Sequence, residues 1–239
     1  MKDTPSGAAP EARYLNGPGA SRPPHALLVV AKRPAPGRTK TRLTPPLRPE
    51  DAAALYECFL RDTLDLVRCV PDVQPAIAYL PAAERDYFAR LAPDFDLVLQ
   101  EGDSLGERLD HALSRYLAAG YRHVAIMNSD GPTLPLACLT GAFDALAGGA
   151  EVVLGPCDDG GYYLIGLRRP APQLLRNVRM STPHVLVDTL ALARQQGLRV
   201  ELLPTWYDVD DADSLARLRE ELDAAGDGVA RHTRAFLAR

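Results

Sequence analysis

The feature of this 239-residue sequence that most restricts its fold is an alternation of short apolar runs with longer segments of helical period. The apolar runs do not alternate with polar residues, which is typical of strands covered by helices on both faces. Such an order predicts an α/β fold, in which a single three-layer domain holds a mixed, mainly parallel sheet of about seven strands. We expect the strands at residues 26–31, 76–80, 96–100, 123–128, 151–155, 162–167 and 198–203.

Local signals place several helices between these strands. Residues 49–70 carry apolar side chains at helical spacing behind an acidic first turn. The “SLGERL” segment that begins at Ser104 has the pattern of a capping box, which predicts a helix start. Thr182, followed by proline, predicts another helix start, and Gly197 is expected to end that helix.

Composition and the chain ends exclude some classes of function. A net charge of -4 argues against a nucleic-acid partner, and no run approaches the roughly 18 apolar residues that a membrane span needs.

Residues 1–24 are expected to be a disordered leader, 25–223 the folded domain, and 224–239 a tail or frayed helix. The four cysteines show no CxxC pair and no His at zinc spacing, so we expect structural thiols in a reducing cytoplasm. Oligomeric state is not indicated.

A basic loop follows the first predicted strand. It contains Lys32, Arg38, Lys40 and Arg42 among prolines and a glycine, and it lacks the GxxxxGK[ST] order of a Walker A loop. In open parallel sheets, ligands bind beyond the carboxyl ends of the strands. Proline and glycine limit the freedom of this backbone and could hold the cationic groups over a polyphosphate. The alternative is a solvated basic loop.

Polar residues emerge where a middle strand ends. Asn128, Ser129 and Asp130 follow the apolar run of residues 123–127. Carboxylate oxygens are ligands that Mg²⁺ prefers, and Mg²⁺ commonly combines one or two carboxylates with phosphate oxygens. Ser129 is a candidate contact for those phosphates. The alternative is that Asp130 simply forms an Asx turn.

The “DDGG” segment at residues 158–161 has two compatible interpretations. Asp-Gly between apolar runs is a strong hairpin signal. Gly160 and Gly161 would also let a ligand approach the backbone closely, with Asp158 or Asp159 reaching a sugar hydroxyl or an acceptor.

A late acidic segment, “WYDVDDADSL”, precedes a helix that is expected to begin near Ala212. The helix dipole is a sufficient reason for acidic residues in that first turn. Asp208 and Asp210 lie before the turn and share one face if the segment is extended. They could therefore reach a metal ion that Asp130 also touches.

Several segments together resemble a known family. In this order, “AKRPAPGRTKTRL”, “QEGDSLGERL”, “NSDGPTLP”, “GPCDDGGYYLIGL”, “STPHVLVDTL” and “DVDDADSL” resemble the DUF2064 family of the nucleotide-diphospho-sugar transferase superfamily. The resemblance covers about residues 26–222 and implies a GT-A-like, Rossmann-like domain. Members are described as glycosyltransferases associated with radical-SAM or selenium-related clusters. Met180 stands where the family pattern has Trp ahead of “STP”, and Gly131 replaces the residue that more often follows the aspartate.

The resemblance implies roles for individual residues. Asp130 and Asp210 match positions that bind a divalent metal ion, Mg²⁺ or Mn²⁺. The “DDGG” segment falls where such enzymes shape the acceptor pocket. Three residues fall in the segment near the nucleoside: Gln100, Gly102 and Leu105. The phosphate-handling loop holds Lys32, Arg38, Lys40 and Arg42, of which Lys40 is also a catalytic candidate.

These residues lead to three hypotheses of function. The first is a metal-dependent glycosyltransferase that moves a sugar from an NDP-sugar to a small-molecule acceptor, with Asp158 or Asp159 as the base. The second is a nucleotidyltransferase, because the basic loop resembles the loop that phospholactate guanylyltransferases use on a triphosphate. The third is a non-catalytic nucleotide-binding module, against which the two metal carboxylates argue. A hydrolase triad is disfavoured, since no Gly-x-Ser-x-Gly elbow is present.

Overall fold

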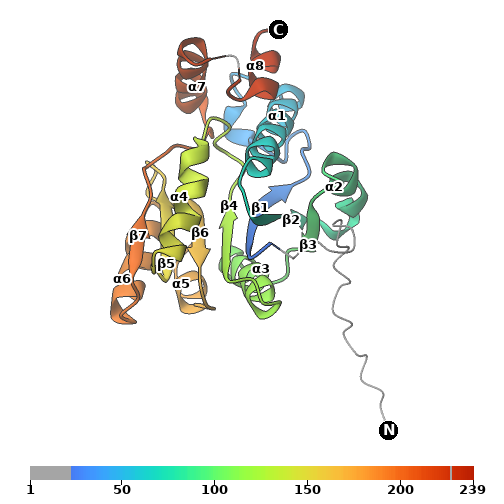
Figure 1. The fold of residues 1–239 in the computed structure, drawn as a ribbon. Helices are drawn as coiled ribbons and strands as arrows, with labels where there is room; N and C mark the ends of the chain where they lie inside the picture. Colours follow the sequence, from blue (N-terminus) through green and yellow to red (C-terminus); the bar gives the residue numbers. More distant parts are fainter. Residues whose placement is uncertain (1–22, 227) are drawn as a thin grey trace.

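A computed structural model of the protein describes residues 23–226 and 228–239, and residues 1–22 of the predicted leader lie outside them. The chain forms one seven-stranded sheet in the order β3-β2-β1-β4-β6-β5-β7 (Figure 1). The strands are β1 His25–Lys32, β2 Val73–Leu80, β3 Asp96–Leu99, β4 His123–Met127, β5 Val152–Pro156, β6 Tyr162–Leu167 and β7 Val200–Leu202. The predicted α/β fold and its seven strands are confirmed.

Helices cover both faces of this sheet. The buried side chains of α1, α2 and α4 share one core with the sheet, and those of α3, α5 and α6 share a second core on the opposite face. A third apolar cluster joins α1 to α7, near the upper end of the sheet in Figure 1. The helices are α1 Pro49–Arg68, α2 Arg85–Leu91, α3 Leu105–Ala118, α4 Leu136–Ala147, α5 Gln173–Arg176, α6 Val185–Gln195, α7 Ala212–Ala224 and α8 Arg231–Leu237, with short 3-10 turns η1 Thr41–Leu43 and η2 Ala82–Glu84. None of the helices in the described ranges is both long and apolar enough to cross a membrane.

The direction of the strands brings the candidate residues to one edge. β1 pairs in parallel with β2 and β4, whereas β6 runs antiparallel to both β4 and β5. Residues 157–161 connect β5 to β6, so the predicted hairpin is confirmed. The carboxyl ends of β1 and β4 therefore lie beside the tip of this hairpin.

The helix starts predicted at residue 49, at Ser104 and near Ala212 are confirmed, whereas the start predicted at Thr182 is wrong. Ser104 caps α3, since its Oγ accepts a hydrogen bond from the Glu107 backbone N–H at 3.2 Å and the Glu107 carboxylate bonds back. Thr182 does not cap α6. Its hydroxyl donates to the Arg179 carbonyl at 3.0 Å, so the local turn takes the group that would have capped the helix. The helix begins three residues later, at Val185.

The last helix is tied to the domain by a buried carboxylate. Asp62 of α1 accepts hydrogen bonds from the backbone N–H groups of His232 and Thr233, each at 2.9 Å. These are donors in the first turn of α8 that have no partner within the helix. Residues 231–237 are therefore held against α1 as an ordered helix.

A stacked pair of histidines lies at the opposite edge of the sheet from the candidate residues. The rings of His25 and His123, the first residues of β1 and β4, have centroids 4.6 Å apart and are almost parallel. Only 7% of His123 is exposed. Burial lowers the pKa of His123 to about 4, and the neighbouring His25 acts in the same direction.

Acid is expected to destabilise the fold through His123. In the unfolded chain this group takes up a proton near pH 6.5, whereas in the folded protein it stays neutral until about pH 4. The contribution of neutral His123 to the free energy of unfolding is therefore present above pH 6.5, and it is lost as the pH falls from 6.5 toward 4. In urea unfolding, the free energy of unfolding should decrease from pH 7 to pH 5. This decrease should be smaller in His123→Phe than in the wild type, by ~1–2 kcal/mol. The exposed His184→Asn is the control, and equal decreases in all three proteins would contradict the assignment.

Candidate active site

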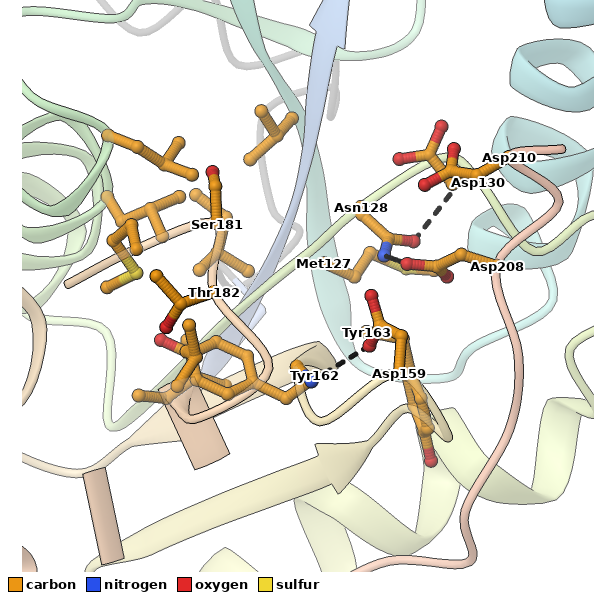
Figure 2. Close-up of a pocket in the computed structure, with 18 of the residues that line it drawn as sticks. Met127, Asn128, Asp130, Asp159, Tyr162, Tyr163, Ser181, Thr182, Asp208 and Asp210 are labelled. Atoms are coloured by element: carbon orange, nitrogen blue, oxygen red, sulfur yellow. Dashed lines mark hydrogen bonds between the residues drawn. The ribbon is translucent and has the colours of Figure 1, made fainter. Parts of the chain in front are cut away.

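A cavity of about 550 Å³ lies beyond the carboxyl ends of β1 and β4, where parallel sheets generally bind ligands (Figure 2). We call it the central cavity. Its polar wall is formed by the end of β4, the hairpin tip and the segment ahead of α7. Its apolar wall comes from Val30, Leu105, Leu109, Ile126, Ile165, Met180 and Val185.

Three aspartates meet at the polar wall. Asp130 follows β4, while Asp208 and Asp210 precede α7, and the backbone N–H of Val209 donates to the Asp130 carbonyl at 2.9 Å. Asn128 orders the group, because its Nδ2 donates to Asp208 Oδ2 at 2.9 Å and its Oδ1 accepts from the Asp130 N–H at 3.2 Å (Figure 2). Two segments that are distant in the sequence are thereby fixed side by side.

Asp208 is the buried member of this group. Burial raises its pKa to about 7, and the neighbouring charge of Asp130 adds to the effect. Its Oδ1 atom has no hydrogen-bond partner in residues 23–226 and 228–239. The family resemblance implies cation binding by Asp130 and Asp210, and the alternate spacing of Asp208 and Asp210 predicts that Asp208 faces the same side.

Lys40 is buried between two of the carboxylates. Its Nζ lies 2.5 Å from Asp130 Oδ1 and 2.7 Å from Asp210 Oδ1, and 5% of the side chain is exposed. The ring centroids of Tyr56 and Phe59 lie 5.9 and 5.8 Å from the same nitrogen. Burial opposes the charged form, but the two carboxylates outweigh it and raise the pKa of Lys40.

The other basic residues of this loop remain at the rim. Arg42 pairs with Asp210 Oδ2, although its side chain is 69% exposed. Lys32 and Arg38 are exposed, and neither forms an ion pair with any described residue. Lys40 is thus the buried cation of this segment, and of its exposed cations Arg42 lines the central cavity.

The two candidate bases in the hairpin point to different places. Asp159 lines the central cavity, and its Oδ1 accepts a hydrogen bond from the Gly161 N–H at 2.8 Å (Figure 2). Asp158 is instead paired with Arg217 of α7, 2.6 Å away, at an exposed position outside the cavity lining. Gly160 packs against the segment that leads into α6.

The candidates near the nucleoside are only partly brought to the cavity. Leu105 lines it, whereas the buried Gln100 donates through Nε2 to the Ala78 carbonyl at 2.7 Å and joins β3 to β2. Gly102 lies in the tight turn before α3. Ser129 is buried, with its hydroxyl 3.0 Å from the Tyr56 hydroxyl, and it does not line the cavity.

The sequence does not identify most of the apolar wall, and of the 180–185 segment only Met180 is singled out for the site, by its departure from the family pattern. Leu109, Ile126 and Ile165 belong to regular elements whose pattern is the same as that of core residues. Ser181 and Thr182 reach the cavity because the chain bends there, with a positive φ of 61° at Ser181. No local sequence signal distinguishes these residues from core and turn positions.

Two comparisons with known proteins decide the family. The model of the family described as an uncharacterized protein conserved in bacteria, DUF2064, matches residues 63–182. The crystal structure of a candidate nucleotide-diphospho-sugar transferase from Desulfovibrio desulfuricans G20 is 32% identical over 90% of this chain and 94% of that chain, with a TM-score of 0.83. The chain belongs to the DUF2064 family. No curated protein matches it in sequence.

More distant structures share the fold of this DUF2064 protein. CMP:2-keto-3-deoxy-manno-octonic acid synthetase, complexed with CTP, is 11% identical over 84% of this chain and 98% of that one, with a TM-score of 0.52. Rv0371C of Mycobacterium tuberculosis H37Rv, in complex with manganese, is 23% identical over 82% and 97%, with a TM-score of 0.52. The fold is that of nucleotide-diphospho-sugar transferases, which supports a transferase without distinguishing glycosyl from nucleotidyl transfer.

Proposed function

We propose that this DUF2064 protein is a divalent-cation-dependent glycosyltransferase that moves a sugar from an NDP-sugar to an uncharged hydroxyl acceptor. The observation that carries the proposal is the charge of the central cavity. Its lining contains four carboxylates, those of Asp130, Asp159, Asp208 and Asp210, and one cationic side chain, Arg42, which is already paired with Asp210. Asp130 and Asp210 are paired with Lys40 and Arg42, whereas Asp159 forms no ion pair with a described residue. A phosphorylated acceptor would be repelled by Asp159, whereas an uncharged hydroxyl would not.

The three aspartates ahead of α7 and after β4 suit a hard divalent cation, Mg²⁺ or Mn²⁺. They offer carboxylate oxygens, and the buried Oδ1 of Asp208 has no partner among the described residues. A positive group, the Lys40 ammonium, already lies between Asp130 and Asp210. When bound there, the cation would neutralise charge that develops on the diphosphate leaving group. The manganese complex of Rv0371C is consistent with this assignment.

Two groups of residues would act on the substrates. Lys40 and the exposed Lys32, Arg38 and Arg42 would contact the diphosphate of the donor. Asp159 would be the base, since Gly161 fixes its Oδ1 and leaves Oδ2 available to the acceptor. The acceptor oxygen would attack the anomeric carbon of the sugar, its proton would pass to Asp159, and the nucleoside diphosphate would leave with the electrons of the broken bond.

A nucleotidyltransferase is the second candidate. One observation favours it: the segment that supplies Arg42 to the cavity also carries the exposed cations Lys32 and Arg38, which suits a triphosphate donor. In that reaction a substrate phosphate would attack the α-phosphorus of an NTP, and pyrophosphate would leave. This candidate requires the acceptor phosphate to lie in the cavity near Asp159, whose carboxylate forms no ion pair with a described residue.

The two reactions release different products. With Mg²⁺ or Mn²⁺, we expect release of the nucleoside diphosphate from at least one of UDP-, GDP- and TDP-sugars, slowly without an acceptor and faster with one. Incubation with each NTP and pyrophosphatase is expected to yield no phosphate above background. Pyrophosphate release that depends on a phosphorylated acceptor would refute glycosyl transfer.

Neighbouring aspartates of the hairpin provide the control. Asp159→Asn should slow transfer to the acceptor by roughly 10²-fold or more, because it removes the proposed base. Asp158→Asn changes the adjacent residue, which is paired with Arg217 outside the cavity, and should leave the rate near that of the wild type. If both variants lose activity equally, Asp159 is not the base.

A further inference from the structure

The position of Lys40 has a consequence for the order in which ligands bind. Its ammonium group makes two ion pairs, with Asp130 and Asp210, and only 5% of the side chain is exposed to solvent. The two carboxylates are less buried, with 31% and 33% of their side chains exposed, and both line the central cavity. A ligand that enters from the cavity therefore meets the same two carboxylates that Lys40 already holds.

We propose that Lys40 is an internal counter-ion, which occupies the divalent-cation position in the nucleotide-free protein and leaves it when cation and nucleotide bind together. This inference rests on the proposed function, because it takes Asp130 and Asp210 as cation ligands. Lys40 then has two successive partners: the carboxylates in the free protein, and donor phosphate oxygens in the complex.

Charge balance explains why the two ligands should bind cooperatively. A divalent cation between Asp130 and Asp210 would lie beside the Lys40 ammonium and would be repelled by it at short range. Moving the ammonium away without a new partner would leave a buried cation unpaired, which is unfavourable. The phosphates of a nucleotide remove both penalties, since they accept the ammonium and also bind the cation. Each ligand should therefore raise the affinity for the other by the same factor.

The surroundings of Lys40 are suited to such an exchange. The ammonium also lies over the aromatic rings of Tyr56 and Phe59. Neither ring carries a carboxylate, so neither adds an ion pair to those with Asp130 and Asp210. The lysine side chain is a flexible stem with a single point charge, so it can change partners by rotation without movement of the backbone. Arg42, by contrast, is an exposed neighbour whose ion-pair partner is Asp210.

The test measures Mn²⁺ binding to the full chain by electron paramagnetic resonance of free Mn²⁺, without substrate turnover. Lys40→Met removes the ammonium and keeps an unbranched side chain. We expect it to bind Mn²⁺ alone at least ~10-fold more tightly than the wild type, and we expect the gain in affinity from UDP, GDP or TDP to shrink by a similar factor. The thermal midpoint of Lys40→Met should also rise more on addition of Mn²⁺ than that of the wild type.

Two variants distinguish occupation of the cation position by the Lys40 ammonium from a general effect of removing positive charge. Arg42→Met removes a cation that pairs with the same Asp210, and Lys32→Met removes an exposed cation of the same loop. Both should change the affinity for Mn²⁺ alone much less than Lys40→Met does, because exposed charges are screened by solvent. If Arg42→Met raises the affinity as much as Lys40→Met, the ammonium does not occupy the cation position and the inference is overturned.

The remaining outcomes are also decisive. Lys40→Gln retains a polar end group and replaces Lys40→Met if the latter fails to fold. An unchanged affinity for Mn²⁺ alone in the Lys40 variants would overturn the inference and leave the proposed cation site standing. If the wild type and the Lys40 variants all fail to bind Mn²⁺, with and without nucleoside diphosphate, the proposed cation site is itself wrong and the inference falls with it.

Discussion

Asp130→Asn is expected to lower the rate of the proposed sugar transfer by roughly 10²- to 10³-fold, because a neutral amide is a poor ligand for the proposed divalent cation, which would offset charge on the leaving group. The substitution keeps the shape of the side chain. It also keeps the hydrogen bond from the Val209 N–H to the carbonyl of residue 130, which joins the end of β4 to the segment before α7. The measurement is release of nucleoside diphosphate from the NDP-sugar that the wild type prefers, at saturating donor.

The stability of this variant must be measured beside its activity. Asp130 is one of two ion-pair partners of the buried Lys40, so its loss also leaves that ammonium with Asp210 alone. Circular dichroism and the thermal midpoint distinguish loss of fold from loss of the cation ligand. A folded Asp130→Asn protein that transfers sugar at the wild-type rate would refute the cation site, whatever the donor.

The strands and the edge that carries the site were predictable because both follow from local patterns. Each apolar run is short enough to be a strand, and the direction of a parallel sheet then places Asp130 and the basic loop at one edge. The capping box at Ser104 was predictable for the same reason, since every group it needs lies within four residues. Thr182 has the same local signal, but its hydroxyl bonds to Arg179 instead.

The buried polar groups were not predictable, because their partners are distant in the chain. Lys40 is predicted to bind phosphate from the loop after the first strand, and its burial against Asp210, which lies 170 residues later, has no local sequence signal. The burial of Asp208 likewise depends on how the segment before α7 packs against the end of β4. Gln100 is a similar case: the family resemblance implies a position near the nucleoside, whereas its side chain donates to the backbone of β2.

Gly160→Ala is expected to have the largest effect on stability among substitutions in the hairpin, about 2–4 kcal/mol in the free energy of unfolding. Gly160 has a positive φ of 88°, which costs about 1 kcal/mol for alanine. An added Cβ would also lie 2.0 Å from the carbonyl oxygen of Pro183, which is backbone and cannot rotate away. The Leu186 N–H donates to the Gly160 carbonyl at 3.0 Å, so the contact joins the hairpin to the start of α6.

Gly197→Ala is the matched control for this prediction. Gly197 also has a positive φ, of 65°, but a Cβ added there would meet no atom within 4 Å, so only the backbone cost of about 1 kcal/mol is expected. Urea unfolding of both variants separates the contact with Pro183 from the cost of the conformation. Gly160→Ala should also raise the KM for the sugar donor or acceptor, since a shift of Pro183 displaces Ser181 and Thr182, which line the central cavity. Equal losses of stability in the two variants would show that the close approach of Gly160 to Pro183 does not contribute to the stability of the hairpin.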